Sequence, residues 1–213
     1  MSSNIDGIMI ILSSPSGAGK TTLVKKISSI KNFEISISYT TRKPRSNEED
    51  GKHYFFINKK KFEKLIIDGE LIEYANVFNN YYGTSKNKVL KFLREGKQVL
   101  FDIDWQGAKQ IKEKKLGFKS ISFFILPPSR KELYDRLSKR DINDKSIVDL
   151  RMKQFDKDVL HWKDYDYVVV NDQIDKCCNE ILNYIDNELE NKKIYYNKEN
   201  IQKHINFLLS WIF

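Results

Sequence analysis

A short run near the start of the chain has the residue types and the spacing of a phosphate-binding loop. The strand-like apolar run from Ile8 to Leu12 leads into small residues, a Gly-Lys-Thr triplet and a helix-like segment. In such a loop, the backbone amides and the positive end of the helix face phosphate oxygens. Lys20 would reach the β and γ phosphates of ATP, and the Thr21 hydroxyl would bind Mg²⁺. The predicted ATP-binding residues of the loop are Ser14, Pro15, Ser16, Gly17, Ala18, Gly19, Lys20 and Thr21.

One position of this loop departs from the common G-x-x-x-x-G-K-[ST] pattern, because Ser14 stands where the first glycine is expected. A small residue can serve there if its backbone angles are ordinary. Gly17 and Gly19, in contrast, are expected to allow a close approach that a β-carbon would block.

Two carboxylates follow another apolar run, Val99 to Phe101, which predicts a buried strand of the same sheet. Asp102 ends this strand at the edge where the phosphate loop is expected, so it could orient Mg²⁺ directly or through water. Asp104 is also placed to cap the helix-like segment that begins at Trp105, and both roles stay open for it.

The segment between about residues 38 and 84 has side chains that suit a nucleoside monophosphate. Arg42 and Arg45 could grip a phosphate with their guanidinium forks. Tyr54, Tyr82 and the hydroxyl of Thr84 could complete a polar cup. A solvated basic hairpin with surface tyrosines is the alternative that the spacing leaves open.

Glu73 lies in a strand-like run between Ile72 and Tyr74. A carboxylate there can accept hydrogen bonds from the N1–H and 2-amino groups of guanine, a donor pair that adenine lacks. A buried site that demands such donors can discriminate by roughly 10⁴ or more. The residue type therefore favours a guanine site over an adenine site.

A cluster of arginines lies in the second half of the chain. Arg136 and Arg140 are one helical turn apart, and Leu133 and Leu137 form the opposite, apolar face. Together with Arg151, they can neutralise the charge that spreads over a transferring phosphoryl group. An exposed, charged helix face is the common alternative.

The elements that must position these residues form an alternation of strands and helices. Unbroken apolar runs are typical of strands buried on both faces of a parallel sheet. These runs are 8–12, 99–101, 121–126 and 168–170, and helix-like segments follow the first three at 23–29, 105–115 and 129–140. The order predicts an α/β fold with a parallel-sheet core and helices on both faces.

Other segments depart from this alternation. Residues 39–88 predict a small α+β insertion with strands at 53–57 and 71–77 and a helix at 59–68. One apolar helical stripe contains Val148, Met152, Phe155, Val159 and Trp162, and another, at 175–190, contains Cys178, Leu182, Ile185 and Leu189. The tail after residue 191 is basic and then apolar. It predicts a helix packed on the domain or a self-association contact, in preference to a membrane-surface contact.

Composition narrows the class of protein. The 213 residues are 40% hydrophobic and 31% charged, as in globular proteins. No apolar run approaches the roughly 20 residues of a membrane span, and the polar start is unlike a signal peptide, so we expect a cytoplasmic protein. The net charge of +8 fits a polyanionic partner or a merely Lys-rich composition, and decides nothing alone. Adjacent Cys177 and Cys178 match no metal or disulfide spacing and are expected to be apolar helix residues.

Taken together, the motifs resemble those of guanylate kinases over about residues 7–190. They are SPSGAGKT at 14–21, SYTTRKPR at 38–45, GKHYFF at 51–56, EYA at 73–75, NYYGT at 80–84, DIDWQG at 102–107 and PPS at 127–129. Such an ordered set is far more specific than a lone phosphate loop.

The resemblance implies a core of residues 7–38 and 89–190, an inserted GMP-binding domain at about 39–88, a helical lid at about 136–150 and a C-terminal extension at 191–213. It implies phosphorylation of GMP, and of dGMP, by ATP with Mg²⁺, in purine nucleotide metabolism. The implied ligands of the GMP phosphate are Arg42, Arg45, Tyr54 and Tyr82, and those of the guanine are Ser38, Glu73 and Thr84. Asp102 and Asp104 would lie between the nucleotides, and Asn171 near the adenine. The transferring phosphate would be held by Lys20, Arg136, Arg140 and Arg151.

Three residues depart from the usual family pattern. Ser14 replaces a glycine, Thr84 adds a methyl group to the usual serine, and Asp141 follows Arg140 where glycine is common. The implied partners are ATP and GMP, without nucleic acid or membrane, while a homodimer stays open. The rivals are another P-loop kinase, a nucleic-acid binder, and a kinase-like binding module, although such modules typically lose the phosphate loop.

Overall fold

The computed structural model describes residues 6–140 and 144–210, which divide into two compact units. The first unit is formed by residues up to 11 and residues 32–120, and the second by residues 12–31 and those from 121 onward. The division falls inside the first strand, β1 (Met9–Ser13). The expectations for Asp141 and for the apolar end of the tail, 211–213, lie outside the described residues.

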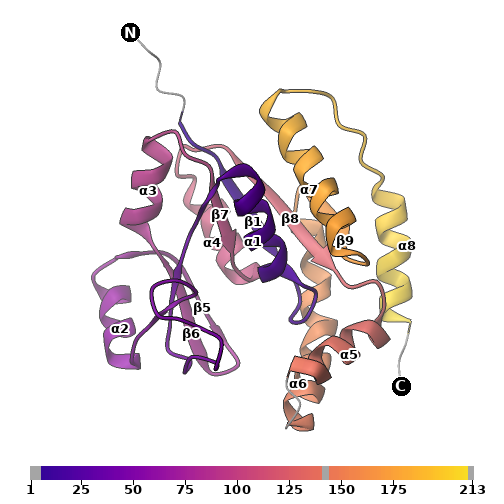
Figure 1. The fold of residues 1–213 in the computed structure, drawn as a ribbon, viewed down its shortest axis with the longest axis horizontal. Helices are drawn as coiled ribbons and strands as arrows, with labels where there is room; N and C mark the ends of the chain where they lie inside the picture. Colours follow the sequence, from indigo (N-terminus) through magenta and orange to yellow (C-terminus); the bar gives the residue numbers. More distant parts are fainter. Residues whose placement is uncertain (1–5, 141–143, 211–213) are drawn as a thin grey trace. The chain divides into compact units, whose positions relative to one another are not determined.

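The first unit contains consecutive strands of a parallel sheet, in the order β2, β7, β1. Of these, β7 and β1 are labelled in Figure 1. β2 (Glu34–Ile35) pairs in parallel with β7 (Val99–Asp102). The backbone N–H of Val99 donates to the carbonyl of Ile8, just before β1. All five residues of β1 and the first three of β7 are buried, which gives this sheet its apolar core. The helices α3 (Lys86–Arg94) and α4 (Trp105–Lys114) belong to the same unit.

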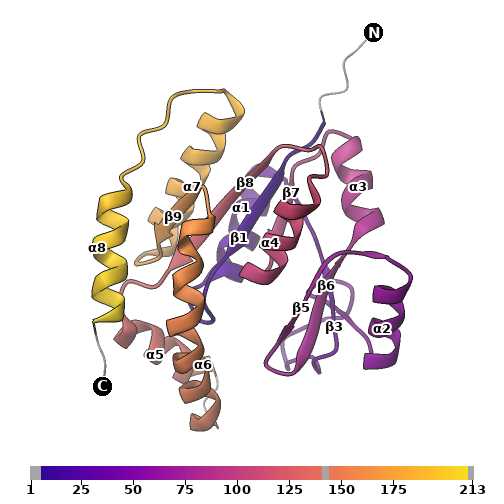
Figure 2. The same ribbon diagram turned by 180° about the vertical axis from the view of Figure 1, so that it is seen from behind.

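A second, mainly antiparallel sheet lies in the first unit, in the order β4, β3, β6, β5. Its strands are β4 (Phe55–Phe56), β3 (Ser38–Thr40), β6 (Asn80–Ser85) and β5 (Leu71–Val77). Helix α2 (Lys59–Ile67) lies beside this sheet (Figures 1 and 2). The Asn58 side chain caps the helix, and the buried Phe62 stacks on Tyr81 of β6 with ring centres 5.3 Å apart.

The second unit contains the parallel strands β8 (Ser120–Leu126) and β9 (Tyr167–Val170). Helix α1 (Lys20–Lys31) packs against α7 (Ile174–Leu189), and Lys31 donates to Asp186 at 2.6 Å. Helices α5 (Arg130–Arg140) and α6 (Lys145–Asp158) contact each other (Figure 2), and α6 continues as the 3₁₀ helix Val159–Asp164. The last element is α8 (Lys198–Leu209).

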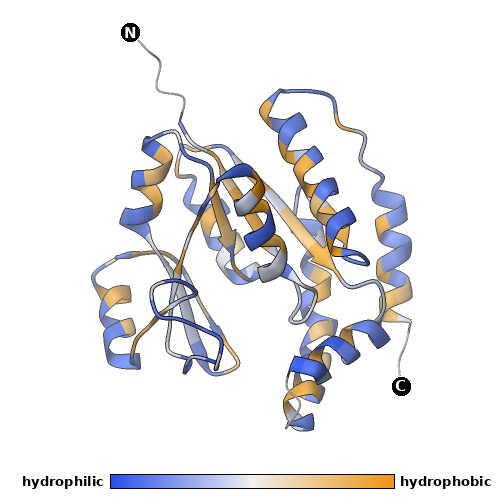
Figure 3. Cartoon of the chain, viewed as in Figure 1, coloured by the Kyte–Doolittle hydropathy of each residue, from blue (hydrophilic) through white to orange (hydrophobic). Residues whose placement is uncertain are grey.

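The predicted α/β fold with a parallel sheet is confirmed, because the four apolar runs form β1, β7, β8 and β9. In Figure 3 the apolar colour runs along β8, whereas the helices carry both colours. Both cysteines lie in a helix, as expected; both are buried, and burial raises the pKa of Cys177 to about 12. The tail helix packs through Ile205 and Leu208, which are 1% and 0% exposed.

Some expectations were wrong in detail. The strand expected at 53–57 is only Phe55–Phe56, because Gly51 donates to the Tyr54 carbonyl and a turn occupies the preceding residues. The stripe through Val159 and Trp162 is buried, but it leaves the α-helix for a 3₁₀ turn after Asp158. Leu189 is 36% exposed because α7 ends there. Within the described ranges, no helix is both long enough and apolar enough to cross a bilayer.

Candidate functional site

The residues predicted to recognise guanine lie side by side across the second sheet of the first unit. Ser38 on β3 is opposite Thr84 on β6, and Thr84 is opposite Glu73 on β5. Directly opposed residues of neighbouring strands point to the same face. The Ser38 and Thr84 hydroxyls are 3.0 Å apart, and all three residues are at most 6% exposed. This buried row of oxygens can accept hydrogen bonds from a planar ligand with several N–H donors.

A β-bulge sets the direction of the Glu73 side chain. Two steps on β5, from Leu71 to Glu73, match a single step on β6, so Ile72 is the extra residue. In a regular ladder Ile72 would be opposite Thr84, and the Glu73 side chain would lie on the other face. Gly107 in α4 provides the space, because a β-carbon there would lie 2.3 Å from Glu73 Oε2.

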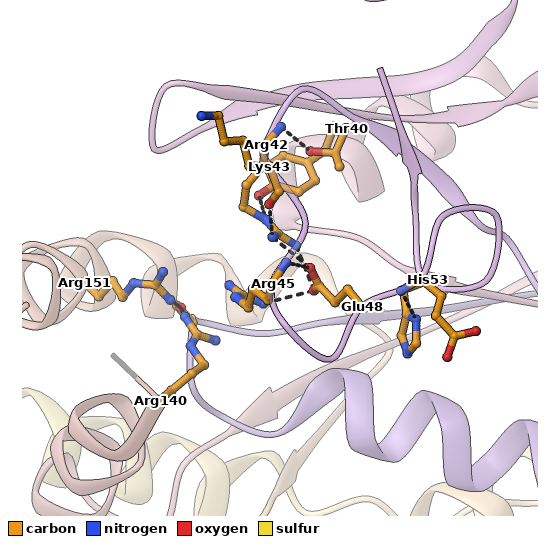
Figure 4. A network of polar contacts seen from close by, with 11 residues as sticks. Thr40, Arg42, Lys43, Arg45, Glu48, His53, Arg140 and Arg151 are labelled. Atoms are coloured by element: carbon orange, nitrogen blue, oxygen red, sulfur yellow. Dashed lines mark hydrogen bonds and ion pairs between the residues drawn. The ribbon is translucent and has the colours of Figure 1, made fainter. Parts of the chain in front are cut away.

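The predicted phosphate-binding arginines converge on a carboxylate, Glu48, that the sequence analysis did not single out (Figure 4). Nη1 and Nη2 of Arg42 each donate to Glu48 at 2.9 Å. Arg45 donates its backbone N–H at 2.8 Å and Nη1 at 3.3 Å. A guanidinium group binds a carboxylate and a phosphate with the same bidentate geometry, so a phosphate can bind where the Glu48 carboxylate binds. Glu48 therefore holds both arginines in position in this structure.

The charge of Glu48 should contribute to the pH dependence of folding. Burial by itself would raise the pKa of Glu48, but hydrogen bonds from Arg42 and Arg45 outweigh burial and lower the pKa below 4.5. A carboxylate with a lowered folded-state pKa stabilises the folded protein above its unfolded pKa, and this contribution is lost as pH falls through the folded value.

We expect Glu48→Gln to reduce the free energy of unfolding at neutral pH, and the gap to wild type to narrow below about pH 4.5. Urea unfolding followed by circular dichroism across this range measures the gap. Glu49→Gln is the matched control, because the Glu49 side chain is 66% exposed. A gap that stays constant with pH would contradict the ion-pair explanation.

Aromatic hydroxyls complete the arginine cluster. Arg42 Nε donates to the Tyr82 hydroxyl at 3.3 Å, and the rings of Tyr54 and Tyr82 meet edge to face at 5.9 Å. Burial raises the pKa of Tyr54, and the nearby charge of Asp102 raises it further. The Tyr54 hydroxyl therefore stays protonated and can donate to an anion.

The arginine–tyrosine cluster and the hydroxyl–carboxylate row share one face of one sheet. Tyr82 and Thr84 are two residues apart on β6, so their side chains lie on the same face about 7 Å apart. A cation-rich site at one end and a row of buried acceptors at the other suit the phosphate and the base of one nucleotide.

Asp104 acts as the predicted helix cap. Its Oδ1 accepts from the backbone N–H of Gly107 at 3.0 Å, and its Oδ2 accepts from the Gln106 side chain at 2.9 Å. These bonds fix the start of α4, the helix whose Gly107 lies against Glu73. Its role beside a nucleotide stays a prediction.

The predicted phosphate loop lies in the second unit, between β1 and α1. Gly17 and Gly19 have φ angles of +90° and +97°, whereas Ser14 is not among the described residues with positive φ. Ser14 therefore meets the condition of ordinary backbone angles. A β-carbon at Gly19 would lie 2.2 Å from the Asn171 amide, and one at Gly17 would lie 2.9 Å from Leu133. The close approach that these glycines permit is thus to the protein's own side chains.

Two of the predicted lid arginines reach this loop. Arg140 on α5 and Arg151 on α6 both donate to the Ser16 hydroxyl, at 3.0 and 2.9 Å. Figure 4 shows their guanidinium groups meeting. Arg136 instead donates to the Asn171 carbonyl at 3.1 Å and pairs with Glu132 at 3.0 Å. The geometry concentrates positive charge over the loop, which is what a polyphosphate requires.

Asn171 connects the phosphate loop to β9, the strand directly before Asn171 in the chain. Its side-chain amide donates to the Ala18 carbonyl at 2.7 Å, and its backbone N–H donates to Leu126 at 2.8 Å. The residue follows β9, as the sequence suggested, and is 3% exposed. It holds the phosphate loop in place, and its contact with a base stays a prediction.

Sequence reasoning missed Glu48 and the role of the Ser16 hydroxyl as an acceptor for arginines. The spacing Arg42-x-x-Arg45-x-x-Glu48 was a usable signal, because a carboxylate three residues beyond an arginine can close a turn around it. For Ser16 no local signal exists, because its partners are more than 120 residues away in the chain.

A Gly-Lys-Thr phosphate loop with arginines over it, together with a row of buried hydrogen-bond acceptors on a small sheet, is the pattern of a P-loop nucleotide kinase. The comparisons with known proteins agree with this class. The family model described as guanylate kinase matches residues 7–188. The chain belongs to the guanylate kinase family, whose members phosphorylate GMP using ATP.

Individual relatives cover most of the chain. The guanylate kinase of Buchnera aphidicola subsp. Schizaphis graminum is 44% identical over 182 residues, which are 84% of this chain and 87% of the relative. That of Blochmanniella floridana is 44% identical over 209 residues, covering 96% and 97%. The crystal structure of guanylate kinase from Anaplasma phagocytophilum matches with a TM-score of 0.72 and 34% identity, covering 86% of this chain and 87% of that one.

Proposed function

We propose that this chain transfers a phosphoryl group from ATP to GMP, and also to dGMP, as a cytoplasmic enzyme of purine nucleotide metabolism. The observation that carries the proposal is the Ser38–Thr84–Glu73 row on the same sheet face as the Arg42–Tyr82 cluster. dGMP is included because none of the predicted GMP ligands is assigned to the ribose 2′-hydroxyl.

In this proposal the first unit binds the acceptor nucleotide. Glu73 accepts from the N1–H and 2-amino groups of guanine, and Ser38 and Thr84 hydrogen-bond its remaining edge. The GMP phosphate is held by Arg42, Arg45, Tyr54 and Tyr82. The positions of the row and the cluster on one sheet support this assignment, because a planar base and its phosphate need fixed partners at both ends.

The second unit binds ATP. The loop amides from Ser14 to Thr21 and the N-terminus of α1 surround the phosphates, and Lys20 reaches the γ phosphate. Arg140 and Arg151, which reach the loop at Ser16, move onto the transferring phosphoryl group when ATP is bound. Arg136 assists from its position beside Asn171, the residue assigned to the adenine side.

The reaction needs little acid–base chemistry from the protein. The attacking group is a phosphate oxygen of GMP that is already anionic at neutral pH, so no general base is required. Catalysis comes from alignment of the acceptor and donor and from neutralisation of charge by Lys20 and the arginines. Asp102 and Asp104 complete the site on the acceptor side.

The chemistry of the two predicted metal ligands suits a magnesium ion. Mg²⁺ prefers oxygen ligands. Thr21 is an exposed residue in the first turn of α1, and Asp102 is half-buried at the end of β7. Thr21 would bind the ion directly and Asp102 through water. When bound, Mg²⁺ would neutralise the charge that develops on the phosphates during transfer.

A coupled assay of ADP release tests the function. We expect turnover with GMP and dGMP, at least about 10³-fold lower kcat/KM with AMP, dTMP and small alcohols, and loss of turnover on chelation of Mg²⁺. Equal turnover with AMP would exclude the guanine assignment. A chain that binds GMP without releasing ADP would instead be a binding module, and salt-sensitive binding of oligonucleotides without ATP would favour the nucleic-acid alternative.

A further inference from the structure

The C-terminal segment 192–209 lies beyond the family match, which ends at residue 188. It is nevertheless built into the second unit. Ile205 and Leu208 of α8 are 1% and 0% exposed, so this helix buries an apolar face against the unit. The alignment with the Blochmanniella relative covers about 204 of the 213 residues, so it must enter the tail. The segment is therefore a part of the folded structure with a counterpart in at least one relative.

Tyr196 contacts the edge of β9. Its hydroxyl accepts a hydrogen bond from the backbone N–H of Val168 at 2.9 Å. β9 is the last strand of its sheet, and an edge strand leaves such groups without a strand partner. The Tyr196 ring meets those of Tyr167 and Tyr184 edge to face, at 5.5 and 6.1 Å. Burial raises the pKa of Tyr196 to about 12, so the hydroxyl stays neutral near this edge.

His204 contacts the connection between β8 and α5. Its Nε2 lies 2.9 Å from the carbonyl oxygen of Pro127. Because a carbonyl only accepts, Nε2 must carry a hydrogen and donate it. Pro127 and Pro128 have fixed φ angles and no N–H of their own, so this contact holds a stiff turn that leads into α5 at Arg130.

Both contacts are close in the chain to the residues that hold the phosphate loop. Three residues after Val168, Asn171 donates to the Ala18 carbonyl and accepts from Arg136. The turn at Pro127 leads into the helix whose Leu133 lies against Gly17. Tyr196 and His204 therefore fix the two segments from which the loop is supported.

We propose that Tyr196 and His204 are positioning residues for ATP. They hold β9 and the Pro127–Ser129 turn in place, and these two segments lead to the residues that contact the phosphate loop. The inference rests on the proposed kinase function, because it assigns the loop to ATP. It does not extend to GMP, since Tyr196, His204 and the contacts described above for them lie in the second unit.

The test uses Tyr196→Phe, which keeps the ring and removes only the acceptor, and His204→Ala, alone and together. We expect each single variant to raise KM for ATP roughly threefold to tenfold, the range of one lost hydrogen bond, and the double variant to raise it further. KM for GMP should change less than about twofold. His204→Gln, whose amide can donate, should recover part of the loss.

The matched controls are Tyr195→Phe and Lys203→Ala, which alter exposed neighbours in the chain. Thermal unfolding is measured for every variant. An unchanged KM for ATP, with or without a lower Tm, would overturn the proposal, because the segment would then serve stability alone. An equal rise in KM for both nucleotides would overturn it too.

Calorimetric binding of ATP to the same variants keeps this test separate from that of the kinase function. A wild-type chain that binds ATP but does not phosphorylate GMP would refute the function. The positioning role would still be supported by weaker ATP binding in Tyr196→Phe and His204→Ala, and overturned by unchanged binding.

Discussion

Replacing Lys20 with alanine is expected to lower kcat by about 10³-fold while the affinity for GMP changes less than about twofold. Lys20 is the first residue of α1, directly after the loop whose Gly17 and Gly19 take left-handed angles. In the proposed function its ammonium group neutralises charge on the β and γ phosphates, and such groups contribute about 10² to 10³ each in comparable sites. The predicted GMP ligands lie in the other unit, so GMP binding should be retained.

Steady-state kinetics with both nucleotides, together with GMP binding measured by calorimetry, check this result. Lys25→Ala is the control, because Lys25 is an exposed lysine five residues further along the same helix. Lys20→Met keeps much of the side-chain length and should be as inactive as the alanine variant. Near-normal turnover in either Lys20 variant would remove this residue from the mechanism.

Replacing Glu73 with glutamine is expected to raise KM for GMP by about 10²-fold and to leave KM for ATP unchanged. Glu73 is 2% exposed and lies in the row with Thr84 and Ser38. A carboxylate can accept from both guanine donors at once, whereas an amide turns one oxygen into a donor. Hydrogen bonds to charged groups contribute about 1.5–3 kcal/mol, which corresponds to roughly 10- to 100-fold each.

A second route to the same defect separates ligand recognition from the loss of a buried charge. Gly107→Ala places a β-carbon 2.3 Å from Glu73 Oε2. The substitution should therefore displace the Glu73 carboxylate and raise KM for GMP, although the carboxylate itself is still present. Glu70→Gln is the control, because Glu70 is exposed just before β5. If KM for ATP rose as much as KM for GMP in these variants, Glu73 would have no specific part in guanine binding.

Much of the fold follows from local patterns. The apolar runs that became β1, β7, β8 and β9 are unbroken because strands buried on both faces need no polar alternation. The sequence analysis did not predict the strand β6, because this strand has no unbroken apolar run. Its residues Asn80, Tyr81, Tyr82, Gly83 and Thr84 are polar, aromatic or small, since one face of that strand carries the predicted binding groups.

The sequence alone determined the chemistry that is available: a Gly-Lys-Thr loop after a buried strand, paired arginines, and a glutamate between apolar neighbours. These follow from residue type and spacing, which act over one strand or one helical turn. Only the tertiary structure decided the directions and the partners of these side chains. The bulge at Ile72 turns Glu73 toward Thr84, Glu48 gathers Arg42 and Arg45, and Asn171 fixes the loop at Ala18. Strand register and long-range hydrogen bonds depend on partners distant in the chain, so no local pattern contains them.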